Sequence, residues 1–536
     1  MSIKDALWVA PNEIEIDKLK NLKESYELSD LEAIFAINRS VDLNDFFNSK
    51  ISDYINNKDL VDLQIVVNRI KKAIQNKEKI AILGDYDVDG ITSTSLFIKL
   101  FKSCNIDCIY KIPNREDGYG HSMESVKNLD VDLLLMLDCG SSQDFKEISN
   151  KDICIIDHHQ TSNDPNVLGF INPYRFDIDP LPQEKFKGIC TAGLVFIVIF
   201  HLVEEMKLKF DFKALLDLVA MGTIGDCMEL TGLNRSYVQY GLKLINLKKR
   251  DGIRFLCENL KLDRISSSSV AFYICPCINA AGRLGQSDIA LRFLCNDHES
   301  YELSRTLIGL NSRRKEIEQV CLDEAMSTIN VSNKKCIILE NSEWHPGIVG
   351  ILAGRIKEKF DLPTFVFYKK GDMWKGSARS INGMNIGTLI QDSVCKGFAK
   401  EGGGHAMAGG VSVSEDCFEK WKEFIQENAK FTKQKKKITI DAIMTMKAVY
   451  NVSLDKVAPF GMGNSAPLIL VKSVLLEKTS KYNNHVRLSL NENGFRRSIF
   501  AFKCSEHEFN VGMLVDIIVR VDNIGNIDIV DISNDA

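Results

Sequence analysis

Short apolar runs alternate with segments of helical spacing from Lys79 onward. The runs lack the period-two alternation of a half-exposed strand, and each ends at polar or small residues; they are KIAIL (79–83), DCIYKI (107–112), DLLLML (132–137) and DICII (152–156). Continuous apolar runs of this length, separated by helical segments, are typical of buried parallel strands. The pattern predicts an α/β architecture whose first domain is a doubly wound, mostly parallel sheet.

Two further changes of pattern follow this sheet. Helical spacing dominates residues 191–327, and its most apolar stretch, 191–203, is shorter than the ~20 residues of a membrane span, so it predicts a buried helix. A second α/β unit follows, with strands predicted at 334–340 and 363–368. Valine- and isoleucine-rich segments then alternate with turn residues, as in a small β-barrel; they are 436–444, 466–478, 484–491, 496–502 and 515–523.

These patterns divide the chain into five parts. They are an N-terminal segment (1–60), a first α/β domain (61–200), a helical connector (201–330), a second α/β domain (331–430) and a C-terminal barrel (431–536). The basic run KQKKKI (433–438) has the composition of a linker. A chain of 536 residues has room for this many units, because domains commonly hold about 100–200 residues.

Composition narrows the class of protein. Hydrophobic residues make up 45% of the chain and charged residues 26%, as in ordinary globular proteins. The 15 cysteines are scattered singly, which predicts reduced thiols. The first residues show no basic segment followed by an apolar core, so we expect a cytoplasmic protein. The formal charge of −5 at first argues against a nucleic-acid partner.

Acidic residues follow the predicted strand ends. GDYDVDG (84–90), PNREDGYG (113–120), DCGSS (138–142) and DHHQT (157–161) come directly after the four runs. In sheets of this kind, ligands bind beyond the carboxyl ends of the strands. We therefore expect six carboxylates at or near one edge of the sheet, those of Asp85, Asp87, Asp89, Asp138, Asp157 and Asp226.

A metal centre is the simplest explanation for this cluster, because crowded carboxylates cannot all stay ionised without a cation. Oxygen ligands joined by His158 and His159 suit Mn²⁺, or Mg²⁺, better than structural zinc. One ion does not need so many ligands, and two ions ~3.5–4 Å apart are the usual arrangement for displacement at phosphorus. Phosphoester hydrolysis is the leading chemistry, and bound cations would offset the negative charge enough to allow a polyanionic substrate.

Each feature also has a plainer explanation. Asp85, Asp87 and Asp89 alone would fit a solvated acidic turn, and the two histidines alone would fit a capped turn. Their joint position after buried strands favours the metal centre.

Several motifs resemble a known family. GDYDVDG, LDCG, IDHH and GTIGD resemble, in order and spacing, the signature motifs of the DHH phosphoesterases. Further motifs are similar to those of the RecJ-type single-strand-specific exonucleases of that family; they are INAAGRLG (278–285), WHPGIVGILAGRI (344–356), GSARS (376–380), EGGGHAMAGG (401–410) and PFGMGN (459–464). The resemblance runs from about residue 60 to the end.

The resemblance implies a fold and a function. The two α/β units would be the DHH and DHH-associated domains, and the barrel would be an oligonucleotide-binding (OB) fold. The activity would be 5′ to 3′ exonucleolytic hydrolysis of single-stranded DNA to mononucleotides in recombination and repair. A single-strand-binding protein and a helicase would be partners of a monomeric enzyme.

The resemblance also implies the roles of the metal ligands and catalytic residues. Asp138 would bridge two Mn²⁺ or Mg²⁺ ions. It would hold the first ion with Asp85 and Asp87, and the second with Asp89, His158 and Asp226. His159 would face the phosphate, and Asp157 would orient the neighbouring imidazole. Water between the ions is the expected nucleophile.

Substrate contacts are implied in the same way. The terminal phosphate would be bound by Arg115, Asn279, Arg283, Ser377 and Arg379, and by a glycine-rich turn containing Gly403, Gly404 and His405. In the barrel, the single strand would contact Lys481, Tyr482, His485, Arg487, Arg496 and Arg497, each of which is equally well explained as solvated surface.

Three positions depart from the pattern of the family. Cys277 stands where an arginine is usual, Gly225 replaces a common alanine, and Thr191 replaces a cysteine or glycine. These departures leave the metal ligands intact, and we expect them to affect contacts along the path of the strand.

Two other functions compete with this one. One is a non-catalytic DNA-binding scaffold of the replisome, which would have a related fold without the metal-binding residues. In this sequence all of the metal-binding residues are present. A small-substrate phosphoesterase, acting on oligoribonucleotides, cyclic dinucleotides or nucleotide bisphosphates, would share the two α/β domains. Such relatives are typically shorter and lack the barrel.

Overall fold

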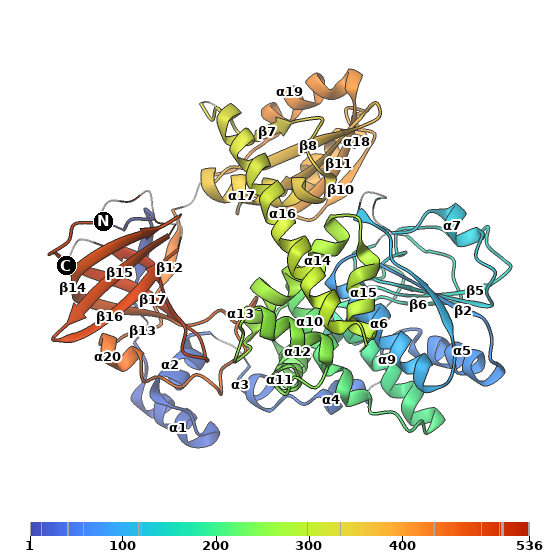
Figure 1. Ribbon diagram of the computed structural model, residues 1–536, viewed down its shortest axis with the longest axis horizontal. Coiled ribbons are helices and arrows are strands. Elements are labelled where there is room, and N and C mark those ends of the chain that lie inside the picture. Colours follow the sequence, from blue (N-terminus) through green and yellow to red (C-terminus); the bar gives the residue numbers. More distant parts are fainter. Residues whose placement is uncertain are drawn as a thin grey trace.

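The computed structural model describes residues 2–533 except 12, 40, 41, 57, 116, 117, 119, 162, 179, 297, 333, 433, 434, 484, 503, 505, 506 and 508. Parts of the predicted strand-end segment 113–120, the linker 433–438 and the barrel segment 484–491 therefore lie outside the described residues. Two α/β units are joined by helices, and a β-barrel lies beside them (Figure 1).

The first unit is a parallel five-stranded sheet of order β3-β2-β4-β5-β6. Alternate side chains of β4 enter two different apolar clusters, which explains the unbroken apolar run: Leu133 and Leu135 face α5, α6 and α9, whereas Leu134 and Met136 face α7. The doubly wound sheet is confirmed, but the prediction that all four runs are buried was wrong for β3, which lies at the edge of the sheet and is mostly exposed. The elements are α5 (Leu63–Asn76), β2 (Ile80–Gly84), α6 (Val88–Ser103), β3 (Cys108–Lys111), α7 (Met123–Lys127), β4 (Leu133–Leu137), β5 (Asp152–Ile156), β6 (Gly169–Ile171) and α9 (Thr191–Met206).

Helices connect this sheet to the second α/β unit. The longest, α16, runs from the helical part to the second unit and packs against α17 (Figure 1). The connecting elements are α8 (Pro180–Gln183), η2 (Glu184–Phe186), η3 (Phe212–Leu215), α10 (Leu216–Gly225), α11 (Gly232–Asn246), α12 (Asp251–Asn259), α13 (Ser267–Ser269), the π-helix η4 (Val270–Ile274), α14 (Cys275–Arg283), α15 (Ser287–Cys295) and α16 (Ser300–Thr328).

The second unit has a mixed sheet of order β10-β11-β9-β8-β7, in which only β7 and β8 are parallel among the described pairings. The glycine-rich segment was expected to be a turn, and this was wrong: Glu401–Gly404 is the edge strand β10, paired with β11. The elements are β7 (Ile337–Glu340), α17 (Pro346–Phe360), β8 (Thr364–Lys370), β9 (Met373–Arg379), α18 (Ile386–Cys395), β10 (Glu401–Gly404), β11 (Ala408–Ser414), η5 (Glu415–Cys417) and α19 (Phe418–Asn428).

The C-terminal unit is a closed barrel, as predicted. Closure follows because β14 pairs with both β15 and β17, and β18 joins β16 to β17. The segment predicted as one strand at 436–444 is divided into β12 and β13. The elements are β12 (Lys437–Thr439), β13 (Ala442–Ile443), α20 (Met446–Val449), β14 (Leu468–Tyr482), β15 (His485–Glu492), β16 (Phe495–Ala501), β17 (Leu514–Val521) and β18 (Ile527–Ser533).

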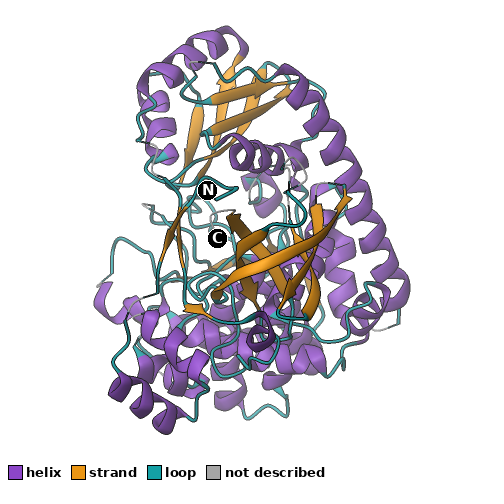
Figure 2. Cartoon of the chain, turned by 90° about the vertical axis from the view of Figure 1, so that its left-hand side faces the viewer, coloured by secondary structure: helices purple, strands orange, loops and turns teal. Residues whose placement is uncertain are grey.

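The N-terminal segment packs on the barrel, so both ends of the chain lie there (Figure 2). Strand β1 pairs in parallel with β12, and the side chains of Leu31, Phe35 and Phe46 enter the apolar core of the barrel. The elements are β1 (Leu7–Val9), α1 (Ile16–Tyr26), α2 (Asp30–Asn38), α3 (Leu43–Asn48) and α4 (Ile51–Ile55).

None of the described helices is by itself long and apolar enough to cross a membrane, while the bent pair Pro180–Phe186 and Thr191–Met206 meets the length and composition criteria jointly.

Candidate metal centre

The first three acidic residues occupy the turn between β2 and α6. Asp87 is the N-cap of α6, and its Oδ1 accepts hydrogen bonds from the backbone N–H groups of Asp89 (3.0 Å) and Gly90 (3.2 Å). A Cβ at Gly90 would lie 2.5 Å from the carbonyl oxygen of Asp85, so the close return of the chain requires glycine. Aspartate is favoured at such helix starts both as a cap and by the helix dipole.

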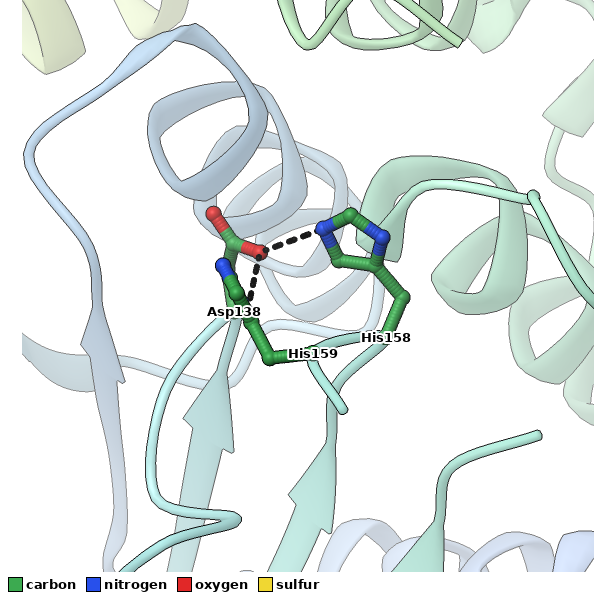
Figure 3. A group of neighbouring side chains, drawn as sticks. All are labelled: Asp138, His158 and His159. Carbon is green, nitrogen blue, oxygen red and sulfur yellow. Dashed lines mark ion pairs between the residues drawn. The ribbon is translucent and has the colours of Figure 1, made fainter. Parts of the chain in front are cut away.

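Asp138 follows β4 in a left-handed conformation, with φ of 62°. This places its carboxylate between the imidazoles of His158 and His159 (Figure 3). The Oδ1 atom lies 3.5 Å from His158 Nε2 and 3.8 Å from His159 Nδ1. Asp138 therefore joins the ends of two neighbouring strands.

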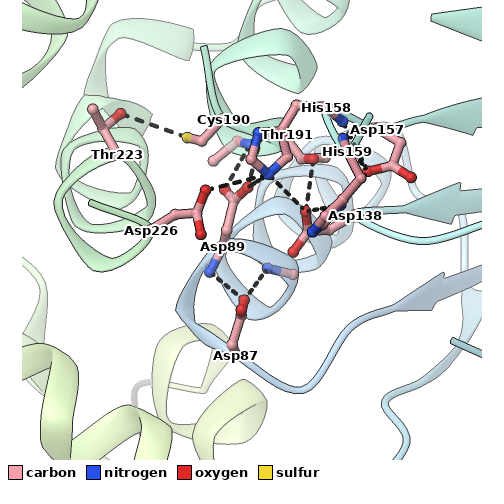
Figure 4. A network of polar contacts seen from close by, with 12 residues as sticks. Asp87, Asp89, Asp138, Asp157, His158, His159, Cys190, Thr191, Thr223 and Asp226 are labelled. Carbon is pink, nitrogen blue, oxygen red and sulfur yellow. Dashed lines mark hydrogen bonds and ion pairs between the residues drawn. The ribbon is translucent and has the colours of Figure 1, made fainter. Parts of the chain in front are cut away.

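Three carboxylates surround the imidazole of His158 (Figure 4). Its Nε2 lies 3.2 Å from Asp226 Oδ2, 3.5 Å from Asp138 Oδ1 and 3.8 Å from Asp89 Oδ2. Asp226 reaches this point from the C-cap of α10, and Asp89 from the first turn of α6. Residues distant in sequence thus meet at one place.

The arrangement forms overlapping groups of potential ligands. The ligand atoms of Asp85, Asp87 and Asp138 lie within 4.8 Å of one another, as do those of Asp89, His158 and Asp226. Asp138 also groups with the two histidines. All six residues expected to bind metal are brought together: Asp138 belongs to two of the three groups, and His158 links it to the third.

The donor atoms fit divalent cations. Asp85 Oδ1, His158 Nε2 and Asp226 Oδ2 are buried and accept no hydrogen bond from the described residues. Buried polar atoms are normally satisfied, so such atoms need an explanation. Carboxylate oxygens with one imidazole are suitable ligands for Mn²⁺ or Mg²⁺.

The raised pKa values of the clustered carboxyl groups also favour bound cations. Burial raises the pKa of the Asp138 carboxyl well above its usual range, and the charges of Asp89 and Asp87 add to this effect. Burial and the charge of Asp89 raise the pKa of Asp226 to about 8. Bound cations would remove this cost of ionisation.

His159 is held by a different contact. Its Nδ1 lies 2.8 Å from Asp157 Oδ1, which also accepts the backbone N–H of His158 at 2.8 Å. Burial alone would lower the pKa of His159, but the hydrogen bond to Asp157 outweighs burial and raises the pKa to about 9. The ring is more exposed than that of His158, at 38% against 9%. His159 is therefore an oriented cation at the opening of the site.

A cavity of about 550 Å³ lies between the two α/β units. Arg115, after β3, lines it from the first unit, Arg283 from the end of α14 in the connecting helices, and Ser377 and Arg379 of β9 from the second unit. Burial lowers the pKa of Arg283 to about 9, with repulsion by Arg115 and other arginines. Glu401 is the one acidic residue among the described residues of the lining. The cavity is suited to an anion.

The other predicted phosphate-binding residues do not line this cavity. Asn279 Oδ1 accepts the backbone N–H of Val88 at 3.2 Å, so Asn279 supports the start of α6. Gly403 and Gly404 belong to β10, and the backbone N–H of His405 bonds to the carbonyl of Ala408 at 2.8 Å. Of this glycine-rich segment, which was expected to approach the phosphate, Gly402 lines the cavity.

Three of the predicted barrel contacts, Tyr482, His485 and Arg487, form an aromatic and basic surface on the outer face. The Tyr482 and Phe500 rings lie 5.8 Å apart, those of His485 and Phe502 5.1 Å apart, and the Arg487 guanidinium lies 5.6 Å from the Phe500 ring. Phe500 and Phe502 were missed, although their alternation with buried Ile499 and Ala501 is the pattern of an outward-facing row. The remaining contacts are Lys481, Arg496, paired with Glu477, and Arg497, over the rings of Phe495 and Tyr450.

Of the three departures from the family pattern, Cys277 and Thr191 are buried and Gly225 is partly buried. Cys277 Sγ lies 3.5 Å from Asn311 Nδ2. A Cβ at Gly225 would lie 2.8 Å from Val88 Cβ, so alanine would require this contact to widen. Thr191 lies against the acidic cluster, donating a hydrogen bond to Asp138.

Three family models match the chain. The DHH family N-terminal domain matches residues 79–223, the DHHA1 domain matches 333–431, and the RecJ OB domain matches 430–524.

Curated relatives and solved structures agree with these models. The single-stranded-DNA-specific exonuclease RecJ of Haemophilus influenzae is 33% identical over 69% of each chain. That of Bacillus subtilis is 28% identical over 91% of this chain and 65% of its own length. The chain thus spans about two thirds of the length of the curated relatives.

The crystal structure of RecJ in complex with Mn²⁺ from Thermus thermophilus matches with a TM-score of 0.83, covering 99% of this chain and 80% of that one at 24% identity, which shows the fold. A crystal structure of exonuclease RecJ bound to manganese is 30% identical, with a TM-score of 0.59, over 69% of this chain and 94% of that one. From the identity and coverage of these relatives, the chain belongs to the RecJ family.

Proposed function

We propose that the chain is a two-metal-dependent exonuclease that hydrolyses the phosphodiester bonds of single-stranded DNA. The observation that carries this proposal is that Asp138 belongs to two of the ligand groups and lies 3.5 Å from His158 of the third, beside buried ligand atoms that form no hydrogen bond with the described residues. Two adjoining groups of this composition suit two-metal phosphoryl chemistry. The names of the relatives support the same substrate.

Six residues would bind the metal ions, and His159 would be a hydrogen-bond donor to the substrate. Mn²⁺ or Mg²⁺, held by Asp85, Asp87, Asp89, Asp138, His158 and Asp226, would supply Lewis acidity and an activated water when bound. His159, kept protonated at neutral pH by Asp157, would donate a hydrogen bond to a phosphate oxygen. Asp157 acts as its positioning residue.

The arginine-lined cavity supports exonucleolytic action. A terminal phosphate carries more charge than an internal one, and the guanidinium groups of Arg115, Arg283 and Arg379 can each form paired hydrogen bonds to it. Occupation of this cavity would place the strand end at a fixed position relative to the metal ligands. We propose that this terminus is the 5′ end and that mononucleotides are released.

Wider aspects of function are proposed on the family relationship. They are a role in recombination and repair, a cytoplasmic monomer, and cooperation with a single-strand-binding protein and a helicase. We also propose that the five parts, 1–60, 61–200, 201–330, 331–430 and 431–536, are its domains.

One assay tests the central proposal. Single-stranded DNA labelled internally, with or without a 5′ phosphate, is incubated with protein and Mn²⁺, alongside RNA and duplex controls. We expect the 5′-phosphorylated single strand to be shortened fastest, releasing mononucleotides. Asp138→Ala should lose cleavage yet retain single-strand binding in a mobility-shift assay.

The same assay separates the rivals when dinucleotides are added as a further substrate. A replisome scaffold would bind DNA without cleavage in both wild type and Asp138→Ala. A small-substrate phosphoesterase would cleave dinucleotides and leave long strands intact. Either result would refute the exonuclease proposal.

A further inference from the structure

Thr191 is a buried residue at the start of α9 that contacts two of the proposed metal ligands. Its backbone N–H donates to Asp89 Oδ2 at 2.7 Å, and its hydroxyl donates to Asp138 Oδ1 at 2.9 Å (Figure 4). The residue is fully inaccessible to solvent. Neither contact was evident from the sequence, because Thr191 lies 53 positions from Asp138 and 102 from Asp89.

The hydroxyl bonds to the oxygen of Asp138 that faces the histidines. That same Oδ1 lies 3.5 Å from His158 Nε2 and 3.8 Å from His159 Nδ1. An aspartate at the end of a strand can rotate about its side-chain bonds unless a neighbour holds it. The hydroxyl of Thr191 restrains the Asp138 carboxylate through Oδ1, so its hydrogen bond does not occupy Oδ2.

The side chain and the backbone of Thr191 have separable roles. Its backbone N–H binds Asp89 as part of the start of α9, because the next backbone N–H, that of Ala192, also donates to Asp89, at 2.9 Å. Any residue other than proline would preserve this bond. The bond to Asp138 requires a hydroxyl, because glycine has no donor and a cysteine thiol is a weak one.

We propose that Thr191 is a positioning residue, whose hydroxyl fixes the bridging carboxylate of Asp138 in the orientation that serves both metal positions. This inference rests on the proposed two-metal function. It assigns a role to a position where the family pattern has cysteine or glycine, so this chain would hold its bridging ligand by a contact that the usual residues cannot make equally well.

Substitution of the hydroxyl alone tests the proposal. Thr191→Val removes the donor while keeping the β-branched shape, and Thr191→Ser keeps the donor. Thr223→Val is the matched control, because Thr223 is equally buried and its hydroxyl contacts only groups that are not proposed ligands among the described residues, the carbonyl of Val219 at 2.8 Å and Cys190 Sγ at 3.6 Å. Binding of Mn²⁺ to each chelator-treated protein is measured by titration calorimetry, with melting temperature measured before metal is added.

We expect Thr191→Val to weaken Mn²⁺ binding by about 10- to 100-fold, as is usual when a group that orients a metal ligand is removed. Thr191→Ser should restore binding to within about threefold of wild type, and Thr223→Val should bind as wild type does. The spectroscopic signature of paired Mn²⁺, an exchange-coupled paramagnetic resonance signal, should be lost in Thr191→Val and regained in Thr191→Ser.

The proposal is overturned if Thr191→Val binds Mn²⁺ as wild type does, or if its weaker binding is matched by Thr223→Val. If Thr191→Val does not fold, Thr191→Cys replaces it, and equal Mn²⁺ affinity of the cysteine and serine variants would refute the role of the hydroxyl. Failure of the wild type itself to bind Mn²⁺ is a separate result, which would remove the proposed function.

Discussion

Asp226 is the ligand whose environment gives the clearest dependence on pH. Burial and the nearby Asp89 raise its pKa to about 8 in the folded protein. In the unfolded chain the pKa returns to roughly 4. Protonation of Asp226 therefore stabilises the folded, metal-free protein. This contribution to stability is complete below about pH 4 and is lost as the pH rises through about 8.

The predicted outcome concerns chelator-treated protein between about pH 6 and pH 8.5. The melting temperature of the wild type should fall over this range, and that of Asp226→Asn should fall less, because asparagine does not titrate. Thermal unfolding in matched buffers measures both slopes. Parallel slopes would contradict the raised pKa of Asp226.

Residues could be predicted from sequence where their position depends on the parallel sheet alone. Asp85 and Asp138 directly follow buried strands, and His158 is the second residue after another, so the edge they share was evident from the apolar runs. The role of Asn279 was not evident, because its bond to Val88 depends on how α14 packs against α6. Residues positioned by packing between distant helices have no local signal.

At the level of elements, α11 joins three parts of the chain through Arg235. The buried guanidinium donates to the carbonyls of Phe46 (3.1 Å), Val457 (3.1 Å) and Lys456 (2.9 Å), and it lies 3.8 Å from the Phe46 ring. These carbonyls belong to the N-terminal segment and to the segment leading into the barrel. One side chain therefore holds both against the helical part.

Arg235→Met should loosen this junction. It would leave three carbonyls without their donor, each costing about 1–3 kcal/mol if the group stays buried and unpaired. We expect faster limited proteolysis around residues 46 and 456, observed by mass spectrometry of the fragments. Arg264→Met is the control, because Arg264 is 60% exposed and pairs only with exposed Asp455 among the described contacts. Equal proteolysis of the two variants would argue against the role of Arg235.

Elements were predicted well when they were long and continuous in sequence. Short strands were missed: β6 has three residues, and β18 follows a turn that interrupts its apolar pattern. Strand β10 was mistaken for a turn, because its glycines lack the side chains that normally mark a strand. Pairing with β11 determines its conformation.

For the whole molecule, metal removal is the most direct test. Chelation should lower the melting temperature, and added Mn²⁺ should restore it, because a ligand that binds only the folded state stabilises it, by ~2.7 kcal/mol at 100 times its Kd. Differential scanning calorimetry measures the change. Asp138→Ala provides the control and should show little response to Mn²⁺. An unchanged wild-type transition would count against a resident metal centre.

The assembly of the parts was only partly predictable. The order of the α/β units and the barrel was evident from the pattern, whereas the docking of residues 1–60 on the barrel was not. That docking rests on side chains such as Phe35 and Phe46, which enter the core of a unit almost 400 residues further along the chain. No local periodicity reports such contacts.

The arginine-lined cavity has a mechanical consequence. One wall carries Arg115, of the first α/β unit, and Arg283, of the connecting helices; the other carries Ser377 and Arg379, of the second unit. The guanidinium of Arg283 bonds across to the carbonyl of Gly347 at 2.9 Å, while the charges of Arg115, Arg283 and Arg379 repel one another. A polyanionic chain end bound between these guanidinium groups would neutralise that repulsion, so we expect the two walls to hold together more firmly while the end of a strand is bound.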